Sequence, residues 1–179
     1  MRINLRWPIV LLAFVLTISS IFVVSYWRQQ RLIEEPLIET LLQIEYVEEV
    51  VIKKIENGTE FSVTLKEVDN LYQTYESIEE ILDSTYKDGS YVIALVDQRN
   101  PYLESIYDKI HFALMEGERV GNYSHMNKEI SMLLEQESKL ENYHLWVDQK
   151  RIYLQLSSDN SFLYEIVPLQ FVSGKNTFA

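Results

Sequence analysis

The sequence predicts an α+β domain that follows an N-terminal transmembrane helix. Three observations lead to this fold class: a long uncharged apolar segment near the N-terminus, an Asn-Gly pair between two alternating segments, and helical and strand periodicities that alternate along the remainder. The expected order after the transmembrane helix is α-ββ-α-β-αα-βββ, with the helices packed on a mixed sheet. The 179 residues, of which 47% are hydrophobic, are enough for one packed domain and an anchor.

The transmembrane prediction rests on residues 7–27, which contain no charged side chain and have arginines on both sides. Twenty-one helical residues span roughly 30 Å, the thickness of a bilayer core. Trp7, Tyr26 and Trp27 lie at the two ends, where interfacial aromatic residues are found. A cleaved signal peptide is the main alternative, but its apolar core is shorter and is followed by small residues. The bulky Val24, Tyr26 and Trp27 stand there instead, so an uncleaved anchor is favoured.

The anchor divides the chain into five expected parts. Residues 1–6 form a short tail, residues 7–27 the anchor, residues 28–36 a polar connector, residues 37–170 the α+β domain, and residues 171–179 a flexible tail. Two arginines flank each end of the anchor, so the positive-inside rule gives little preference. A six-residue tail usually remains cytoplasmic, and the C-terminal domain is therefore expected to be extracytoplasmic, on the outer side of the cell membrane.

The first half of the domain contains the strongest turn signal in the sequence. An amphipathic helix is expected over residues 37–46, followed by a hairpin whose two-residue turn is Asn57-Gly58. This turn pairs Ile55 with Glu60 and Ile52 with Val63. The register collects one apolar face, which consists of Val50, Ile52, Phe61, Val63 and Leu65.

The middle of the domain shows two helix starts and one apolar strand. Asp69 or Asn70 caps a helix that runs to about residue 84, and a turn follows at residues 88–89. Residues 91–96 are apolar on both faces, which predicts a central strand of a sheet covered on both sides. Asn100 and Pro101 open a helix that ends near residues 117–121, and Ser124 caps a second helix, so the two form an αα-hairpin.

The C-terminal part reads as a three-stranded meander over residues 144–148, 151–157 and 161–167. A two-residue turn at residues 149–150 pairs Leu145 with Leu154, and a loop at residues 158–160 pairs Leu154 with Tyr164. This register predicts an inward face of Leu145, Val147, Ile152, Leu154, Leu156, Phe162, Tyr164 and Ile166.

The opposite face of the meander is a candidate partner-binding surface, because Trp, Tyr and Arg are enriched in interface hot spots. Two other interpretations remain open: the αα-hairpin packs on this face, or its side chains are cross-strand pairs of a half-exposed sheet. The candidate residues are Trp146, Arg151, Tyr153, Leu163 and Val167.

No residue pattern indicates an enzyme, a cofactor or a metal. Glu104, Asp108 and His111 share one helix side at spacings that could bind a divalent ion, but this pattern is also typical of a solvated helix face. Phosphate-binding loops and nucleophile elbows are absent from the sequence, as is cysteine. The 148 residues after residue 31 hold 12 basic and all 27 acidic residues, a balance that disfavours nucleic acid as a partner.

The element order after the anchor resembles that of extracytoplasmic PAS-like sensor domains, and this likeness concerns order alone. It implies a small-molecule sensing or binding domain as one alternative, and an unrecognised hydrolase is the third. The favoured hypothesis is a membrane-tethered interaction or assembly module, an accessory subunit of an envelope or membrane complex. Its expected partners are the lipid bilayer, through residues 7–27, and another membrane or envelope protein.

Overall fold

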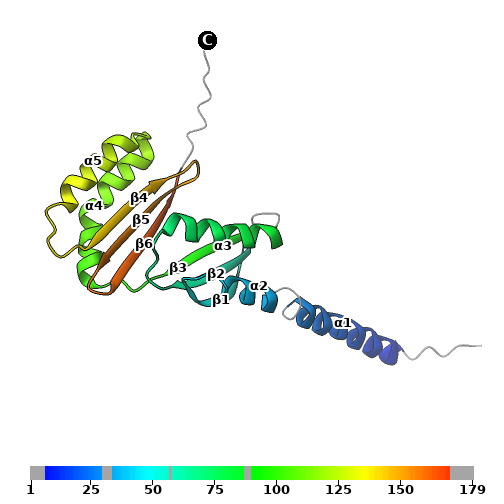
Figure 1. Ribbon diagram of the computed structural model, residues 1–179. Helices are drawn as coiled ribbons and strands as arrows, with labels where there is room; N and C mark the ends of the chain where they lie inside the picture. Colours follow the sequence, from blue (N-terminus) through cyan, green and yellow to red (C-terminus); the bar gives the residue numbers. More distant parts are fainter. Residues whose placement is uncertain (1–6, 30–33, 57, 87–89, 170–179) are drawn as a thin grey trace, which may run out of the picture.

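The computed structural model describes residues 7–29, 34–56, 58–86 and 90–169. The chain is an α+β protein with two three-stranded sheets, one of them mixed, and helices packed on them (Figure 1). The expected tails 1–6 and 171–179, four residues of the connector, Asn57 and the turn at residues 88–89 lie outside the described residues.

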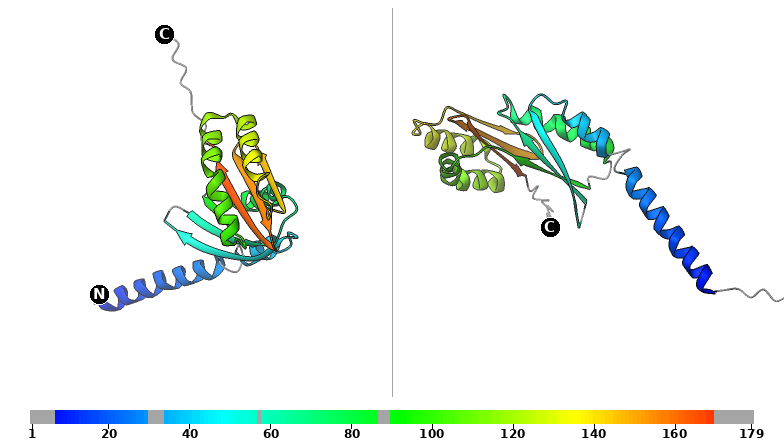
Figure 2. Two further views of the ribbon diagram at one scale, coloured as in Figure 1. Left: turned by 90° about the vertical axis from the view of Figure 1, so that its left-hand side faces the viewer. Right: turned by 90° about the horizontal axis from the view of Figure 1, so that it is seen from below.

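Helix α1 (Trp7–Gln29) is one continuous helix that projects away from the α+β domain (Figures 1 and 2). Large apolar side chains along it are exposed, among them Trp7, Phe14 and Phe22. In the part of the chain that the structure describes, no helix combines the length and the apolar character needed to cross a membrane. The helix predicted for residues 7–27 is present, whereas its role as a transmembrane span is not supported.

The first sheet has the strand order β1-β2-β3 and carries two helices on its inner face. Strands β1 (Val47–Ile55) and β2 (Gly58–Leu65) are antiparallel, and β3 (Tyr91–Val96) runs parallel to β2. Helices α2 (Glu35–Leu41) and α3 (Leu71–Thr85) pack in the same apolar core as this sheet. As expected, Asn70 caps α3, where its side-chain oxygen accepts a hydrogen bond from the Gln73 amide.

The predicted register of the first hairpin is wrong by two residues, although the predicted faces are right. Ile55 pairs with Gly58 rather than with Glu60, and Ile52 pairs with Phe61. Gly58 belongs to β2 with φ of 144°, and an ideal Cβ on it would lie 2.3 Å from the Ser90 carbonyl oxygen. The glycine therefore serves the close approach of β3 to β2, which requires a residue without a side chain.

Strand β3 has the predicted bounds but not the predicted position. It forms an edge of the first sheet instead of its centre, and Val92 is 52% exposed. Its inner side chains, Ile93 and Leu95, pack against the core, while the outer side chains of Val92 and Val96 face solvent. An uncharged strand predicts cover on both faces, but only one face of β3 is covered.

The second sheet is the predicted antiparallel meander, with α4 and α5 on one of its faces (Figure 2). Its strands are β4 (Asn142–Val147), β5 (Arg151–Ser158) and β6 (Ser161–Pro168), and its helices are α4 (Pro101–Val120) and α5 (Tyr123–Leu134). The predicted β4–β5 register is confirmed, since Leu145 pairs with Leu154. Asn122, not Ser124, caps α5 by accepting a hydrogen bond from the His125 amide.

The predicted β5–β6 register is wrong by one residue. The connection is a two-residue turn in which Asp159 and Asn160 have φ of 51° and 58°, so Ser158 pairs with Ser161 and Leu156 with Leu163. A one-residue shift moves every side chain of β6 to the other face. Leu163 and Val167 consequently join the core beneath α4 and α5, while Phe162, Tyr164 and Ile166 face the core of the first sheet.

The two sheets meet where β3 ends and β6 begins. The Phe162 amide donates a hydrogen bond to the Gln98 carbonyl oxygen, and the Tyr164 amide donates to the carboxylate of Asp97. Farther along, β5 and β6 hold the segment before α3 by side-chain contacts. The Gln155 amide group donates to Val68 O at 2.6 Å and accepts from Leu71 N at 3.1 Å. Tyr164 Oη accepts from Val68 N and donates to Lys66 O.

Candidate functional site

The structure separates the five candidate partner-face residues. Tyr153 is fully buried under α3, and Arg151 and Trp146 lie beside it, partly covered. Leu163 and Val167 are buried on the other face, under α4 and α5. The helix that covers Tyr153 is α3, not the αα-hairpin. In this structure the five residues do not form one exposed surface, and whether any of them contacts a partner remains a prediction.

Two of these residues, Arg151 and Tyr153, build a polar network with α3. The guanidinium of Arg151 forms a two-point ion pair with the carboxylate of Glu79 and lies 4.9 Å from the centre of the Tyr75 ring. The rings of Tyr72 and Tyr75 contact Tyr153 edge-on, with centres 5.3 and 5.7 Å apart. A tyrosine stack capped by a paired arginine therefore fixes α3 on the second sheet.

The hydroxyl of Tyr153 anchors the turn between β4 and β5. It donates a hydrogen bond to Asp148 Oδ2 at 2.8 Å, and Asp148 Oδ1 accepts from the Lys150 and Arg151 amides at 2.6 Å each. Burial raises the pKa of Tyr153, and the neighbouring Asp148 adds to the rise. Burial also raises the pKa of Asp148, but the hydrogen bonds that it accepts outweigh this effect, so its pKa is below the usual range. The network thus holds its carboxylate ionised and its phenol protonated at neutral pH.

A surface cleft of about 330 Å³ opens beside this network, and we call it the β3 cleft. Its walls come from α3, from the first half of β3 and from the start of β5. The hydroxyl of Tyr91 donates a hydrogen bond to Asp83 at 2.6 Å across its far end. Burial and this carboxylate both raise the pKa of Tyr91. The lining residues are Tyr75, Glu79, Asp83, Tyr91, Val92, Ile93, Lys150 and Arg151.

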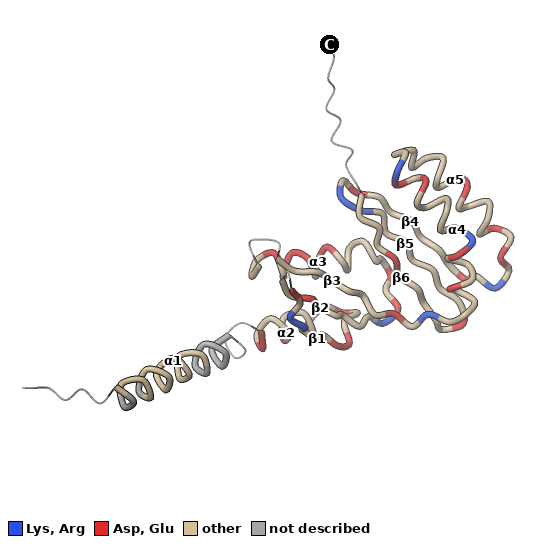
Figure 3. Tube along the Cα trace, turned by 180° about the vertical axis from the view of Figure 1, so that it is seen from behind, with Lys and Arg blue, Asp and Glu red and all other residues tan. Residues whose placement is uncertain are grey.

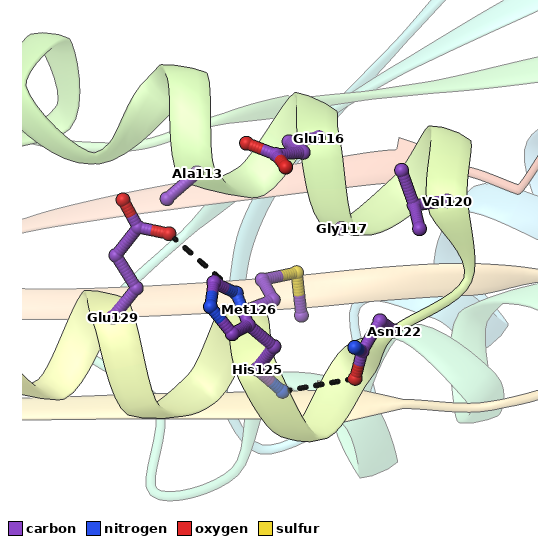
Figure 4. A pocket seen from close by; sticks show the side chains of 8 residues that line it. All are labelled: Ala113, Glu116, Gly117, Val120, Asn122, His125, Met126 and Glu129. Carbon is purple, nitrogen blue, oxygen red and sulfur yellow. Dashed lines mark hydrogen bonds and ion pairs between the residues drawn. The ribbon is translucent and has the colours of Figure 1, made fainter.

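A smaller groove of about 180 Å³ lies between α4 and α5 (Figure 4). Glu116, His125 and Glu129 border it, and His125 Nδ1 lies 3.8 Å from the Glu129 carboxylate. The floor is a packing contact: an ideal Cβ on Gly117 would lie 2.3 Å from the Met126 sulfur. The groove therefore reflects the close approach of two helices rather than a preformed ligand cavity.

Glu104, Asp108 and His111, whose spacing could suit a divalent ion, have other surroundings in the structure. His111 Nδ1 lies 3.1 Å from the Tyr107 hydroxyl, while Glu104 and Asp108 are exposed to solvent. Within the residues described, no group of three or more His, Asp or Glu side chains is arranged to hold a metal.

Sequence reasoning found Arg151 and Tyr153 but missed their partners on α3. Glu79 and Asp83 lie one helical turn apart, a spacing that places both side chains on one side of α3. That signal could have suggested a carboxylate row, yet it could not have indicated which strand lies opposite. Figure 3 shows acidic residues along α3.

No protein-family model matches the chain, and no curated protein matches it significantly.

Proposed function

We propose that this protein is a membrane-tethered interaction or assembly module, an accessory subunit of an envelope or membrane complex. Helix α1 is its tether and the α+β domain carries its binding surface. The observation that carries the proposal is α1 itself, a 23-residue helix that stands apart from the domain with large apolar side chains exposed.

Burial of this exposed apolar surface is favourable, because removing apolar surface from water lowers the free energy by about 25 cal/mol per Å². Among the side chains that the structure describes, both apolar clusters contain residues from α2 onward and none from α1. Residues 7–27 are also uncharged and lie between arginines, as in membrane-inserted helices. These features support lipid as the cover, although no described helix meets the requirements of a span.

A binding role for the domain is supported by its surface. The β3 cleft and the α4–α5 groove are open to solvent, whereas small-molecule sites usually enclose most of the ligand surface. An apolar edge strand with exposed Val92 and Val96 is a feature that proteins use for contacts with other chains.

The test of the tether is extraction of native membranes with alkaline carbonate. The full chain should remain in the membrane pellet, and a variant with Leu11, Phe14 and Ile18 changed to Asp should appear in the supernatant. Protease added to intact cells should degrade the domain if it faces outward. Release of the unchanged protein by carbonate would refute the tether, and protection of the domain until lysis would reverse its orientation.

A further inference from the structure

One edge of β3 has no partner strand among the described residues. The Thr59 amide donates to the Ser90 carbonyl oxygen at 3.0 Å, which fixes the direction of the backbone groups along β3. In a parallel pair, the N–H and C=O of one residue point to the same neighbouring strand, and successive residues alternate. Residues 92, 94 and 96 therefore bond to β2. The N–H and C=O of residues 91, 93 and 95 point to the open edge.

This edge is accessible over its first half. The β3 cleft lies along Tyr91, Val92 and Ile93, so solvent reaches the strand there. The second sheet forms a backbone bridge beyond the far end of β3, between Gln98 and Phe162, and on the cleft side it approaches the first half of β3 with the side chains of Lys150 and Arg151. The edge is also uncharged from residue 91 to residue 96, and it lacks proline or lysine, the residues that commonly block strand addition.

The two sides of the edge differ in chemistry. On the outer side, Val92 and Val96 are exposed and would contact apolar side chains of an added strand. On the inner side lie the cleft and the carboxylates of Glu79 and Asp83. Glu79 is paired with Arg151, and Lys150 lies 3.8 Å from it. Asp83 accepts a hydrogen bond from Tyr91 and pairs with no cation among the described residues.

We propose that the open edge of β3 binds an extended segment of a partner protein by strand addition, and that the segment alternates basic and apolar side chains. The basic side chains enter the β3 cleft and reach Asp83, while the apolar ones pack beside Val92 and Val96. The net charge of −11 favours such a segment over a second copy of this acidic chain. The inference rests on the proposed interaction function and specifies the chemistry of the partner.

The probe is a fluorescein-labelled peptide of seven residues in which valine and lysine alternate. Its binding to the full-length protein in mild detergent is followed by fluorescence anisotropy. Three peptides serve as controls: valine alternating with glutamate, a valine–lysine peptide with the order scrambled, and one with proline at the centre. We expect only the alternating valine–lysine peptide to bind. Proline removes a backbone donor from the added strand and should weaken binding at least tenfold.

Two protein variants complete the test. Asp83→Asn should weaken binding of the valine–lysine peptide about threefold to tenfold, because a charge-assisted contact is lost. Glu80→Gln, an exposed change of equal charge on the same helix, should leave binding unchanged. Equal binding of the lysine and glutamate peptides, or equal effects of the two variants, would overturn the proposal.

Hydrogen exchange tests the edge without any peptide. In the free protein, the amides of residues 91, 93 and 95 should exchange faster than those of residues 92, 94 and 96. Protection of all six amides would show that the edge is already covered. If protection of these amides increases with protein concentration and light scattering shows a dimer, the occupant of the edge is a second copy of the chain, and the proposed basic segment is refuted. None of these outcomes depends on carbonate extraction, so the tether and the binding edge can fail separately.

Discussion

The side chain of Arg151 links α3 to the second sheet through three contacts. Its guanidinium binds Glu79 of α3, lies over the Tyr75 ring, and is 3.4 Å from the Tyr153 hydroxyl. The side chains of Arg151 and Glu79 are 18% and 16% exposed, so loss of one partner leaves the other charge largely desolvated. An unpaired charge of this kind destabilises a fold more than a surface pair stabilises it.

We therefore expect Arg151→Met to lower the free energy of unfolding by about 2–3 kcal/mol. Lys150→Met is the matched control, because Lys150 is 64% exposed and lies 3.8 Å from the same carboxylate. Its effect should stay below about 0.5 kcal/mol. Urea denaturation of the full chain, followed by tryptophan fluorescence, measures both. If the two substitutions cost the same, the ion pair is not the contact that fixes α3.

Asp148 makes stability depend on acid pH. Its pKa is lower in the folded protein than the value of about 3.9 in an unfolded chain. The unfolded chain therefore binds more protons as the pH falls, and stability from this carboxylate is lost. The contribution is complete above the unfolded-state pKa and disappears as the pH falls through the folded-state pKa. The stability difference between wild type and Asp148→Asn should thus be largest near pH 7 and shrink toward pH 3 in urea denaturation; a constant difference would contradict this account.

At the scale of elements, the helices and strands follow from local signals, while two registers do not. Asn70, Asn100 and Pro101 mark helix starts that the structure confirms. The β5–β6 turn uses Asp159 and Asn160 in left-handed conformations, a combination less recognisable than Asn-Gly. At the first hairpin, the Asn-Gly pair predicts a turn role for Gly58, whereas in the structure Gly58 allows the close approach of Ser90, a residue 32 positions away. Local sequence could not show this long-range contact.

Packing of α4 against α5 depends on Gly117. A Cβ there would lie 2.3 to 2.6 Å from three atoms of the buried Met126 side chain, one of them its own Cβ. Gly117→Ala should therefore lower the free energy of unfolding by about 1–3 kcal/mol, as overpacking does. Gly121→Asn is the control, because Gly121 has open space and φ of 73°, which asparagine tolerates. Thermal denaturation should show a clear loss only for Gly117→Ala; equal stability of both variants would mean that the helices separate at little cost.

Local sequence patterns predict only part of the candidate site, because its residues come from distant parts of the chain. The sequence identifies Arg151 and Tyr153 as candidates because arginine and tyrosine are enriched in interface hot spots. The predicted register puts Leu163 and Val167 on the same face, but the observed register differs from it by one residue and moves both to the other face. The carboxylates opposite, Glu79 and Asp83, come from a helix about 70 residues earlier. Helix α3 and strand β5 lie side by side because of tertiary packing, and the periodicity of a strand predicts only its two faces, not the helix that packs on them.

At the scale of the whole molecule, the second sheet contributes to both apolar cores. One face of β5 and β6 packs under α4 and α5, and the other face packs against α3 and the first sheet. Neither core can be completed without this sheet. The domain should consequently unfold as one cooperative unit, although it contains two sheets.

Two substitutions in different cores test this cooperativity. Ile78→Ala opens a cavity under α3, and Leu154→Ala opens one under α4 and α5; both side chains are fully buried. Each should lower the free energy of unfolding by about 2–5 kcal/mol. Circular dichroism and tryptophan fluorescence should report one coincident transition for both variants. Two separated transitions, each shifted by only one substitution, would show that the halves unfold independently.

The contacts of Gln155 and Tyr164 with the segment before α3 can form only late in translation. These hydrogen bonds join residues that are 84 to 98 positions apart. At about 5–20 residues per second, roughly 5 to 20 s pass between translation of Val68 and that of Tyr164. During this interval the backbone of the nascent segment has no β5 or β6 side chain to bind. The first sheet and α3 are therefore synthesised first, but their packing is completed only when β5 and β6 have been made. The apolar strand β3 leaves the ribosome before the second sheet exists.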